Sequence, residues 1–258
     1  MIEVIEQGSG VVELRLSRPP ANLMDIVTLK ALGTSLTSAF EDGRQGVILS
    51  GLPGVFSAGI DSVALLNSGE SGTRAFCQEI FKLAAQMANS PIPIVTAITG
   101  HCIASGVLIS IFSDYRVVAS GNWRLALNEV KVGIALPECF QFALSRIVGS
   151  FFAERILVFG EELTPNQAKK IQLIDEIVPQ HEVVLRAKEK LMELLMLPKH
   201  SMLRAREIAR RDLAQAFPHP DQVAVEELVE SFLHPLTRNI FDHLAENMKR
   251  KELVKISV

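Results

Sequence analysis

Short apolar runs alternate along the first 120 residues with longer segments of a different spacing. The runs at 11–16, 46–51, 94–98 and 116–119 are rich in Val, Ile and Leu and end at glycine, proline or polar residues, which predicts strands. Segments 26–40 and 73–89 repeat apolar residues every three or four positions, as amphipathic helices do, and 105–112 predicts a short buried helix. This alternation predicts an α/β core with mainly parallel strand pairing.

Beyond about residue 150 the pattern becomes almost wholly helical. Helices are expected at 182–197, 201–217, 222–233 and 237–254, separated by prolines at 198, 218, 220 and 235. We therefore expect a core over residues 1–195 and a C-terminal helical region over 196–258. The last helices have wide apolar faces that need a partner, either the chain's own core or a second copy. The residues that define these faces are Leu228, Val229, Phe232, Leu233, Phe241 and Leu244.

Composition argues against several classes of function. The formal net charge of −3 argues against a general nucleic-acid partner, and a single Trp with a single Tyr argues against an aromatic stacking platform. No apolar run approaches a membrane span, and the first residues have no basic leader. The three cysteines lack metal-binding spacing and are expected to be reduced thiols. These features predict a cytoplasmic protein without a metal site or a membrane partner.

Two turns of small residues carry the candidate chemistry. They are Phe56-Ser57-Ala58-Gly59-Ile60-Asp61 and Gly100-His101-Cys102-Ile103-Ala104-Ser105-Gly106, each between a strand-like run and a helix start. Backbone N–H groups in such turns can approach a ligand closely, and one from each turn can hold a carbonyl oxygen that becomes negative. Glu129 follows 23 residues after Gly106 in an apolar segment. The sequence therefore predicts an enolate-forming active site with Glu129 as its base.

These segments, together with Arg18-Pro19-Pro20-Ala21-Asn22 and the segment 171–179, resemble the crotonase superfamily, that is, the enoyl-CoA hydratase/isomerase family. The resemblance covers about two thirds of the chain. It implies a repeated ββα spiral core and a C-terminal helical region that forms homotrimers, often paired into hexamers. It also implies that the chain binds an acyl-CoA thioester and stabilises its enolate with two backbone N–H groups.

Carried over by position, the resemblance makes the N–H groups of Ala58 and Ser105 the two oxyanion donors. Residues Ala58, Gly59, Ile60 and Asp61 would lie along coenzyme A, although Asp61 is equally suited to cap the following helix. The family usually has glycine at the position of Ser105. If that glycine is needed for its backbone angles, serine there is expected to be strained or the loop displaced.

The carboxylates distinguish the reactions of the family. Its hydratases use two glutamates, and the first would stand where this chain has Leu108. The second matches Glu129, preceded by Asn128 as in the Δ3,Δ2-enoyl-CoA isomerases. The resemblance thus implies a β-oxidation isomerase in which Leu108 and Asn128 line the substrate site. Coenzyme A would be part of the substrate, and no separate cofactor is expected. The alternatives are a weak hydratase, a decarboxylase, a C–C hydrolase, or a non-catalytic subunit that binds CoA thioesters.

Overall fold

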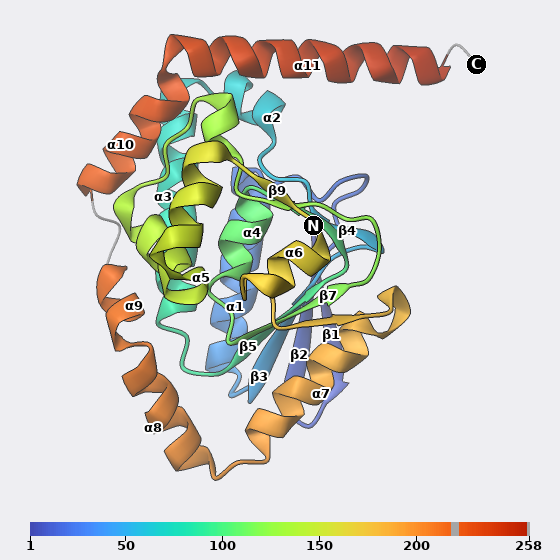
Figure 1. Cartoon of the computed structure of the whole chain (residues 1–258), viewed down its shortest axis with the longest axis vertical. Coiled ribbons are helices and arrows are strands. Elements are labelled where there is room, and N and C mark those ends of the chain that lie inside the picture. The colour runs from blue at the N-terminus through green and yellow to red at the C-terminus, as the bar shows by residue number, and fades with distance from the viewer. Residues whose placement is uncertain (218–221, 257–258) are drawn as a thin grey trace.

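The computed structural model describes residues 1–217 and 222–256, with the backbone alone at 222 and 247–256. A larger sheet has the strand order β1-β2-β3-β5-β7-β10 (Figure 1). Only β1 runs antiparallel to its neighbour, so the predicted strands and their mainly parallel pairing are confirmed. The strands of this sheet are Ile2–Gly8, Val11–Leu16, Gly46–Ser50, Ile94–Ile98, Tyr115–Ala119 and Glu176–Val178.

A smaller sheet has the order β4-β6-β8-β9. Strands β4 (Gly54–Ser57), β6 (Gly100–Ile103) and β8 (Leu125–Ala126) run parallel, and β9 (Glu162–Leu163) pairs antiparallel with β8. The sequence did not predict these strands, because they are short and contain small residues. They lead directly into the turns that carry the candidate chemistry.

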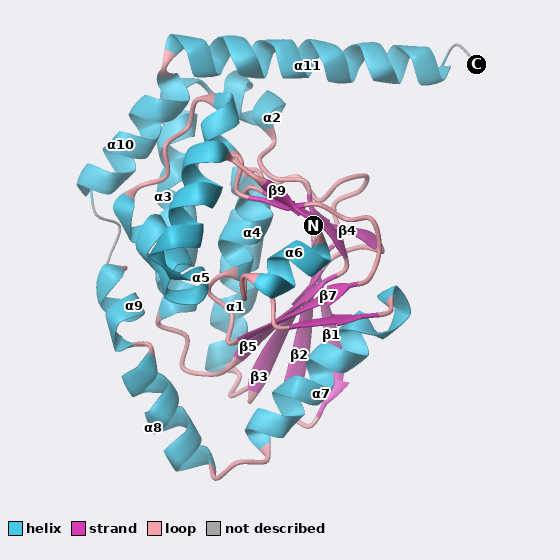
Figure 2. Cartoon of the chain, viewed as in Figure 1, coloured by secondary structure: helices cyan, strands magenta, loops and turns pink. Residues whose placement is uncertain are grey.

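Helices cover both faces of the larger sheet (Figure 2). On one face α7 (Val183–Leu195) packs against β3, β5 and β7, and its Ala187 and Leu191 are fully buried there. On the other face, every second residue of the strands packs into the main core. Helices that include α1 and α3 complete this core. The remaining elements up to residue 182 are α1 Ile26–Glu41, α2 Ser62–Asn67, α3 Gly69–Ala88, α4 Ser105–Ser110, η1 Glu129–Val132, α5 Glu138–Phe159, α6 Pro165–Lys170 and η2 Gln180–Glu182.

The C-terminal helices are α8 (Lys199–Ala209), α9 (Arg211–Ala216), α10 (Gln222–Leu233) and α11 (Pro235–Ile256). The single helix predicted at 201–217 is wrong, because the chain bends at Arg210 between α8 and α9. The predicted division at 195/196 lies between α7 and α8 and stays a prediction.

The partner of the apolar C-terminal faces is largely the chain's own core. Phe232 of α10 packs edge-on against Phe76 of α3 with ring centroids 6.0 Å apart. Helix α11 lies beside α2 at one end of the molecule, opposite the end at which α8 lies (Figure 1). Leu244 remains 41% exposed, whereas the members of these faces that are buried are Leu228, Val229, Phe232 and Phe241.

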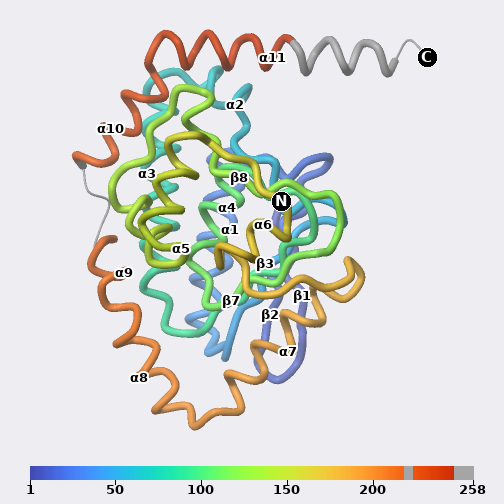
Figure 3. Tube along the Cα trace, viewed as in Figure 1, coloured from blue at the N-terminus to red at the C-terminus, as the bar shows by residue number. Residues whose placement is uncertain are grey.

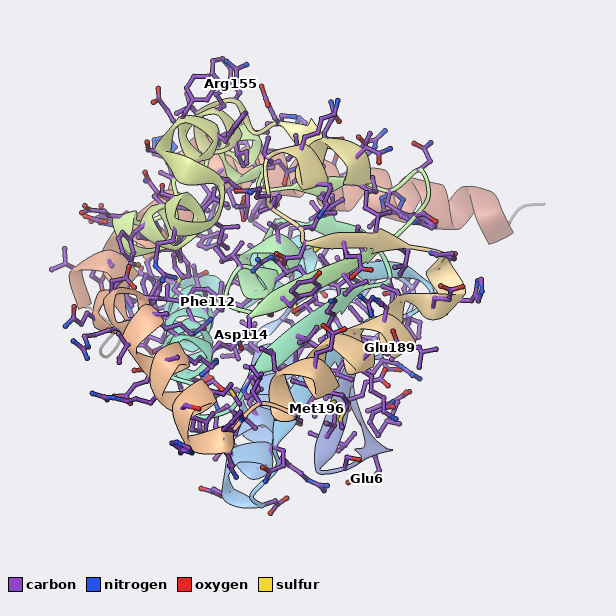
Figure 4. All side chains as sticks on the ribbon, turned by 60° about the horizontal axis from the view of Figure 1, so that its bottom comes forward. Glu6, Phe112, Asp114, Arg155, Glu189 and Met196 are labelled. Carbon is purple, nitrogen blue, oxygen red and sulfur yellow. The ribbon has the colours of Figure 1, made fainter. Side chains whose placement is uncertain are left out.

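Asp114 ties α8 and α9 to the sheet. Its carboxylate accepts the N–H of Ile94 at the start of β5 and pairs with Arg206 and Arg210. Figure 4 labels it beside Phe112, whose carbonyl oxygen accepts a second hydrogen bond from Arg210 at 2.7 Å. Helix α8 and the bend at Arg210 that leads into α9 are therefore held to the sheet by partly buried polar contacts.

Asn22 holds the segment that precedes α1. Its side chain is 1% exposed, its Oδ1 accepts the Arg18 N–H at 2.8 Å, and its Nδ2 donates to the carbonyl oxygens of Leu16 and Phe56 at 3.0 Å each. It also has a left-handed φ of 49°, which asparagine tolerates better than most residues. One side chain thus joins the end of β2 to the end of β4.

We expect Asn22→Ala to lower the free energy of unfolding by about 2–3 kcal/mol, because it leaves buried backbone groups without partners. Urea unfolding at equal protein concentration measures the change. Asn166→Ala, at an exposed position of α6, is the matched control and is expected to change stability by less than about 0.5 kcal/mol. Equal midpoints for the two variants would contradict the role given to Asn22.

Candidate active site

The candidate residues gather at one edge of the smaller sheet. Strand β6 pairs in parallel with β4 on one side and with β8 on the other. The carboxyl ends of parallel strands meet at the same edge, and neighbouring strands lie about 4.8 Å apart. Ile60, Ser105 and Glu129 each follow one of these strands by two or three residues. The fold therefore brings together the three segments that the sequence singled out.

Glycine allows the first two turns to touch. Gly59 has a φ of +97°, and a Cβ atom there would lie 3.1 Å from Cβ of Ala104. A Cβ atom on Gly106 would lie 3.1 Å from Cβ of Ser57. Because both distances are tighter than ordinary contacts, larger residues at either position would push the two turns apart.

The first turn leaves one backbone N–H without a partner. Ala58 N–H donates to the Ala21 carbonyl oxygen at 2.9 Å, and Gly59 N–H donates to Oγ of Ser57 at 3.1 Å. Asp61 N–H donates to the Met24 carbonyl oxygen at 2.9 Å. Within the described residues, the N–H of the intervening Ile60 has no acceptor.

This arrangement corrects the expectation for Ala58, whose N–H is occupied by Ala21 and is not offered to a ligand. Met24 bonds to Gly59 and to Asp61, so Ile60 lies between two bonded positions of an extended segment. Backbone groups alternate in direction along such a segment, and the N–H of Ile60 consequently faces away from Met24. Ile60, which we expected only to line coenzyme A, thus presents the free N–H of this turn.

The second turn ends at a strained residue. Ala104 has φ 50° and ψ −116°, which is unfavourable for an L-residue, and its N–H donates to the Ala126 carbonyl oxygen. Ser105 is the first residue of α4 and does not have a positive φ. Strain expected at Ser105 is therefore found one residue earlier. As the first residue of a helix, Ser105 has no helical partner for its N–H.

Glu129 is a buried carboxylate with a free oxygen. The residue is 5% exposed, begins η1, and has no hydrogen-bond partner for Oε2 among the residues described. Burial raises the pKa of Glu129 to about 7, and a hydrogen bond from its own backbone lowers it to a smaller extent. A carboxyl group with this pKa can accept and return a proton near neutral pH.

A narrow apolar cavity adjoins the second turn. Its volume is about 10 Å³, so side chains nearly fill it, and it is enclosed by α1, α3, α4 and α5, whose neighbouring paths Figure 3 traces. Ser105 is the one polar residue among the described residues of its wall, and Leu108 lies one turn further along α4. The other residues of the wall are Leu29, Ile80, Leu83, Ala84, Met87, Ile109, Phe112 and Phe140.

The remaining site candidates have clear positions. Asp61 caps α2 by accepting the Ala64 N–H at 2.9 Å and pairs with Arg18 at 2.7 Å, so its capping role is confirmed. Asn128 is half-buried and directly precedes Glu129.

Across the described side chains no cluster of His, Cys, Asp and Glu is arranged to hold a metal ion. None of the described helices is long and apolar enough to span a membrane.

The profile of the enoyl-CoA hydratase/isomerase family matches residues 6–238. The chain belongs to this family. Similar members include the mitochondrial enoyl-CoA delta isomerase 1 of Mus musculus, 31% identical over 81% of this chain and 73% of the relative. The Homo sapiens protein of the same name is 29% identical over 81% and 70%.

Hydratases are also among the family members that this chain is similar to. A probable enoyl-CoA hydratase of Mycolicibacterium paratuberculosis is 28% identical over 87% of this chain and 88% of the relative. The crystal structure of human mitochondrial Δ3-Δ2-enoyl-CoA isomerase superposes with a TM-score of 0.90 and 26% identity, over 97% of this chain and 98% of that one. The crotonase fold expected from the sequence is thereby confirmed.

Because Glu129 is buried, we expect the free energy of unfolding to depend on pH. Since its pKa is raised from 4.5 to about 7, the folded state holds this proton more tightly than the unfolded state does. The corresponding stabilisation is complete below pH 4.5 and is lost as pH rises through 7. Relative to Glu129→Gln, the wild type should lose about 3 kcal/mol of unfolding free energy between these limits. Urea unfolding across this range measures the difference, and a difference that does not vary with pH would contradict the assignment.

Proposed function

We propose that this chain moves the double bond of a 3-enoyl-CoA to the 2-position. The observation that carries the proposal is Glu129, a single buried carboxylate with a free oxygen at the edge where two turns present free N–H groups. The position at which the family's hydratases carry their other glutamate holds Leu108, which is 5% exposed and lines an apolar cavity.

In the proposed reaction the thioester oxygen accepts hydrogen bonds from the N–H groups of Ile60 and Ser105. Glu129 removes a proton from C2, the electron pair moves to form the enolate, and the oxygen becomes negative. The enolate then takes the same proton from Glu129 at C4, so no water and no redox partner is consumed. Each N–H aimed at the oxyanion contributes about 2.7–4 kcal/mol to lowering the barrier.

The same geometry supports roles for the neighbouring residues. Ala58, Gly59 and Asp61 would lie along coenzyme A, with Asn128 beside the reacting carbons. The acyl chain would part the apolar side chains next to Leu108, because the cavity there has a volume of only about 10 Å³. These apolar side chains would keep water from the enolate, which favours proton return to carbon over hydration.

A weak enoyl-CoA hydratase is the second candidate. The similarity to the mycobacterial probable hydratase favours it, whereas the leucine at position 108 speaks against it because leucine cannot activate water. The cytoplasmic location stays a prediction from the sequence, and the two mammalian relatives are named as mitochondrial proteins.

Replacing Glu129 by Gln tests the proposal. Turnover of trans-3-hexenoyl-CoA should fall by about 10²–10⁴-fold, because Gln keeps the shape but cannot accept the proton. Affinity for hexanoyl-CoA should change little, which separates catalysis from binding. The wild type should hydrate crotonyl-CoA far more slowly than it isomerises hexenoyl-CoA. A variant that retains most of its turnover, or a wild type that is mainly a hydratase, would refute the proposal.

We also propose that the protein is a homotrimer or a pair of trimers. Exposed aromatic residues on α5 support an interface, with Phe151 66% and Phe159 60% exposed. Light scattering during size-exclusion chromatography should give a mass of three or six chains. A mass of one chain at micromolar concentration would rule this assembly out.

A further inference from the structure

Ser105 carries a hydroxyl group that nothing in the described structure uses. Its side chain is 2% exposed, and Oγ has no hydrogen-bond partner. A buried hydroxyl without a partner costs free energy, so such groups normally find an acceptor. The cavity wall next to Ser105 offers no acceptor side chain, because the other described residues of this wall are apolar.

The position of Ser105 in α4 explains why no local acceptor is available. A serine inside a helix commonly donates to a carbonyl oxygen three or four residues earlier. Ser110, on the same helix, does so to Val107 at 2.8 Å. Ser105 is the first residue of α4, and the residues three and four before it belong to β6. The acceptor for its hydroxyl must therefore come from outside the helix.

Two buried polar atoms at this edge lack hydrogen-bond partners. Oγ of Ser105 and Oε2 of Glu129 both lack a partner, so they are not bonded to each other. Standard bond lengths and staggered rotamers keep Oγ about 2.8–3.7 Å from the nitrogen of the same residue. In the rotamers that place Oγ at the short end of this range, one oxygen atom can accept both the N–H and the O–H of Ser105.

We infer that the Ser105 hydroxyl is a third hydrogen-bond donor to the thioester oxygen, beside the N–H groups of Ser105 and Ile60. This inference rests on the proposed function, since it takes the substrate to be an acyl-CoA thioester bound at these N–H groups. The hydroxyl keeps its proton throughout and stabilises the negative oxygen of the enolate. Glu129 remains the group that moves the proton.

Ser105→Ala tests the inference, with Ser110→Ala as the matched control on the same helix at the same 2% exposure. The Ser105 variant should lose about 10–100-fold in kcat for trans-3-hexenoyl-CoA with little change in KM, because the lost donor acts mainly on the oxyanion. Its melting temperature should stay equal or rise, since an unsatisfied hydroxyl is removed. The Ser110 variant should keep the wild-type kcat.

A second measurement separates hydrogen bonding from a structural effect. The carbonyl stretch of bound hexanoyl-CoA, read by isotope-edited infrared spectroscopy, should move less from its solution frequency in Ser105→Ala than in the wild type. A wild-type frequency in that variant overturns the inference, even if kcat falls. If the wild type binds hexanoyl-CoA but does not isomerise hexenoyl-CoA, the proposed function fails. In that case the carbonyl frequency still tests whether the hydroxyl donates to the oxygen of the bound thioester.

Discussion

The site depends on the hydrogen bonds that join residues 21–24 to the turn at 57–61. Ala21 and Met24 accept two of the turn's N–H groups, and Met24 donates to Gly59. Because these bonds fix the turn on one side, the N–H of Ile60 is held pointing to the other. A donor that is fixed before the substrate arrives needs no reorganisation during the reaction. Asn22, buried between the two segments, supports this arrangement by bonding to the ends of both β2 and β4.

Much of this arrangement is readable from the sequence. Short apolar runs locate β2, β3, β5 and β7 of the larger sheet, and period-3.6 patterns locate helices α1, α3 and α7, because burial demands apolar residues at these positions. Both small-residue turns and Glu129 also stand out locally, the turns by their small residues and Glu129 by its place in an apolar segment. The free N–H of Ile60 could not be read in this way, since it depends on pairing with Met24, 36 residues earlier. Helix α5 was missed because Gly149, at φ +75°, interrupts it and Phe151 and Phe152 lie exposed.

Several groups at the site are unfavourable for folding. Ala104 is strained, the carboxyl group of Glu129 is buried without a cation partner among the described residues, and the hydroxyl of Ser105 is unsatisfied. Each costs on the order of 1–3 kcal/mol, a large part of a typical net stability. They lie together at one edge of a four-stranded sheet, and the extensive apolar core offsets them. The concentration of such costs in one place is typical of a site maintained for chemistry rather than for stability.

Helix α3 connects the cavity to the C-terminal helices. Its residues Ile80, Leu83 and Met87 line the cavity wall, while Phe76 and Arg74 hold α10 through a ring contact and an ion pair with Glu226. A rigid helix transmits a displacement on one face to its other face. Substitutions on α3 that reshape this cavity would therefore shift α10 at the same time. The shape of the cavity and the placement of α10 are consequently expected to change together as the sequence diverges.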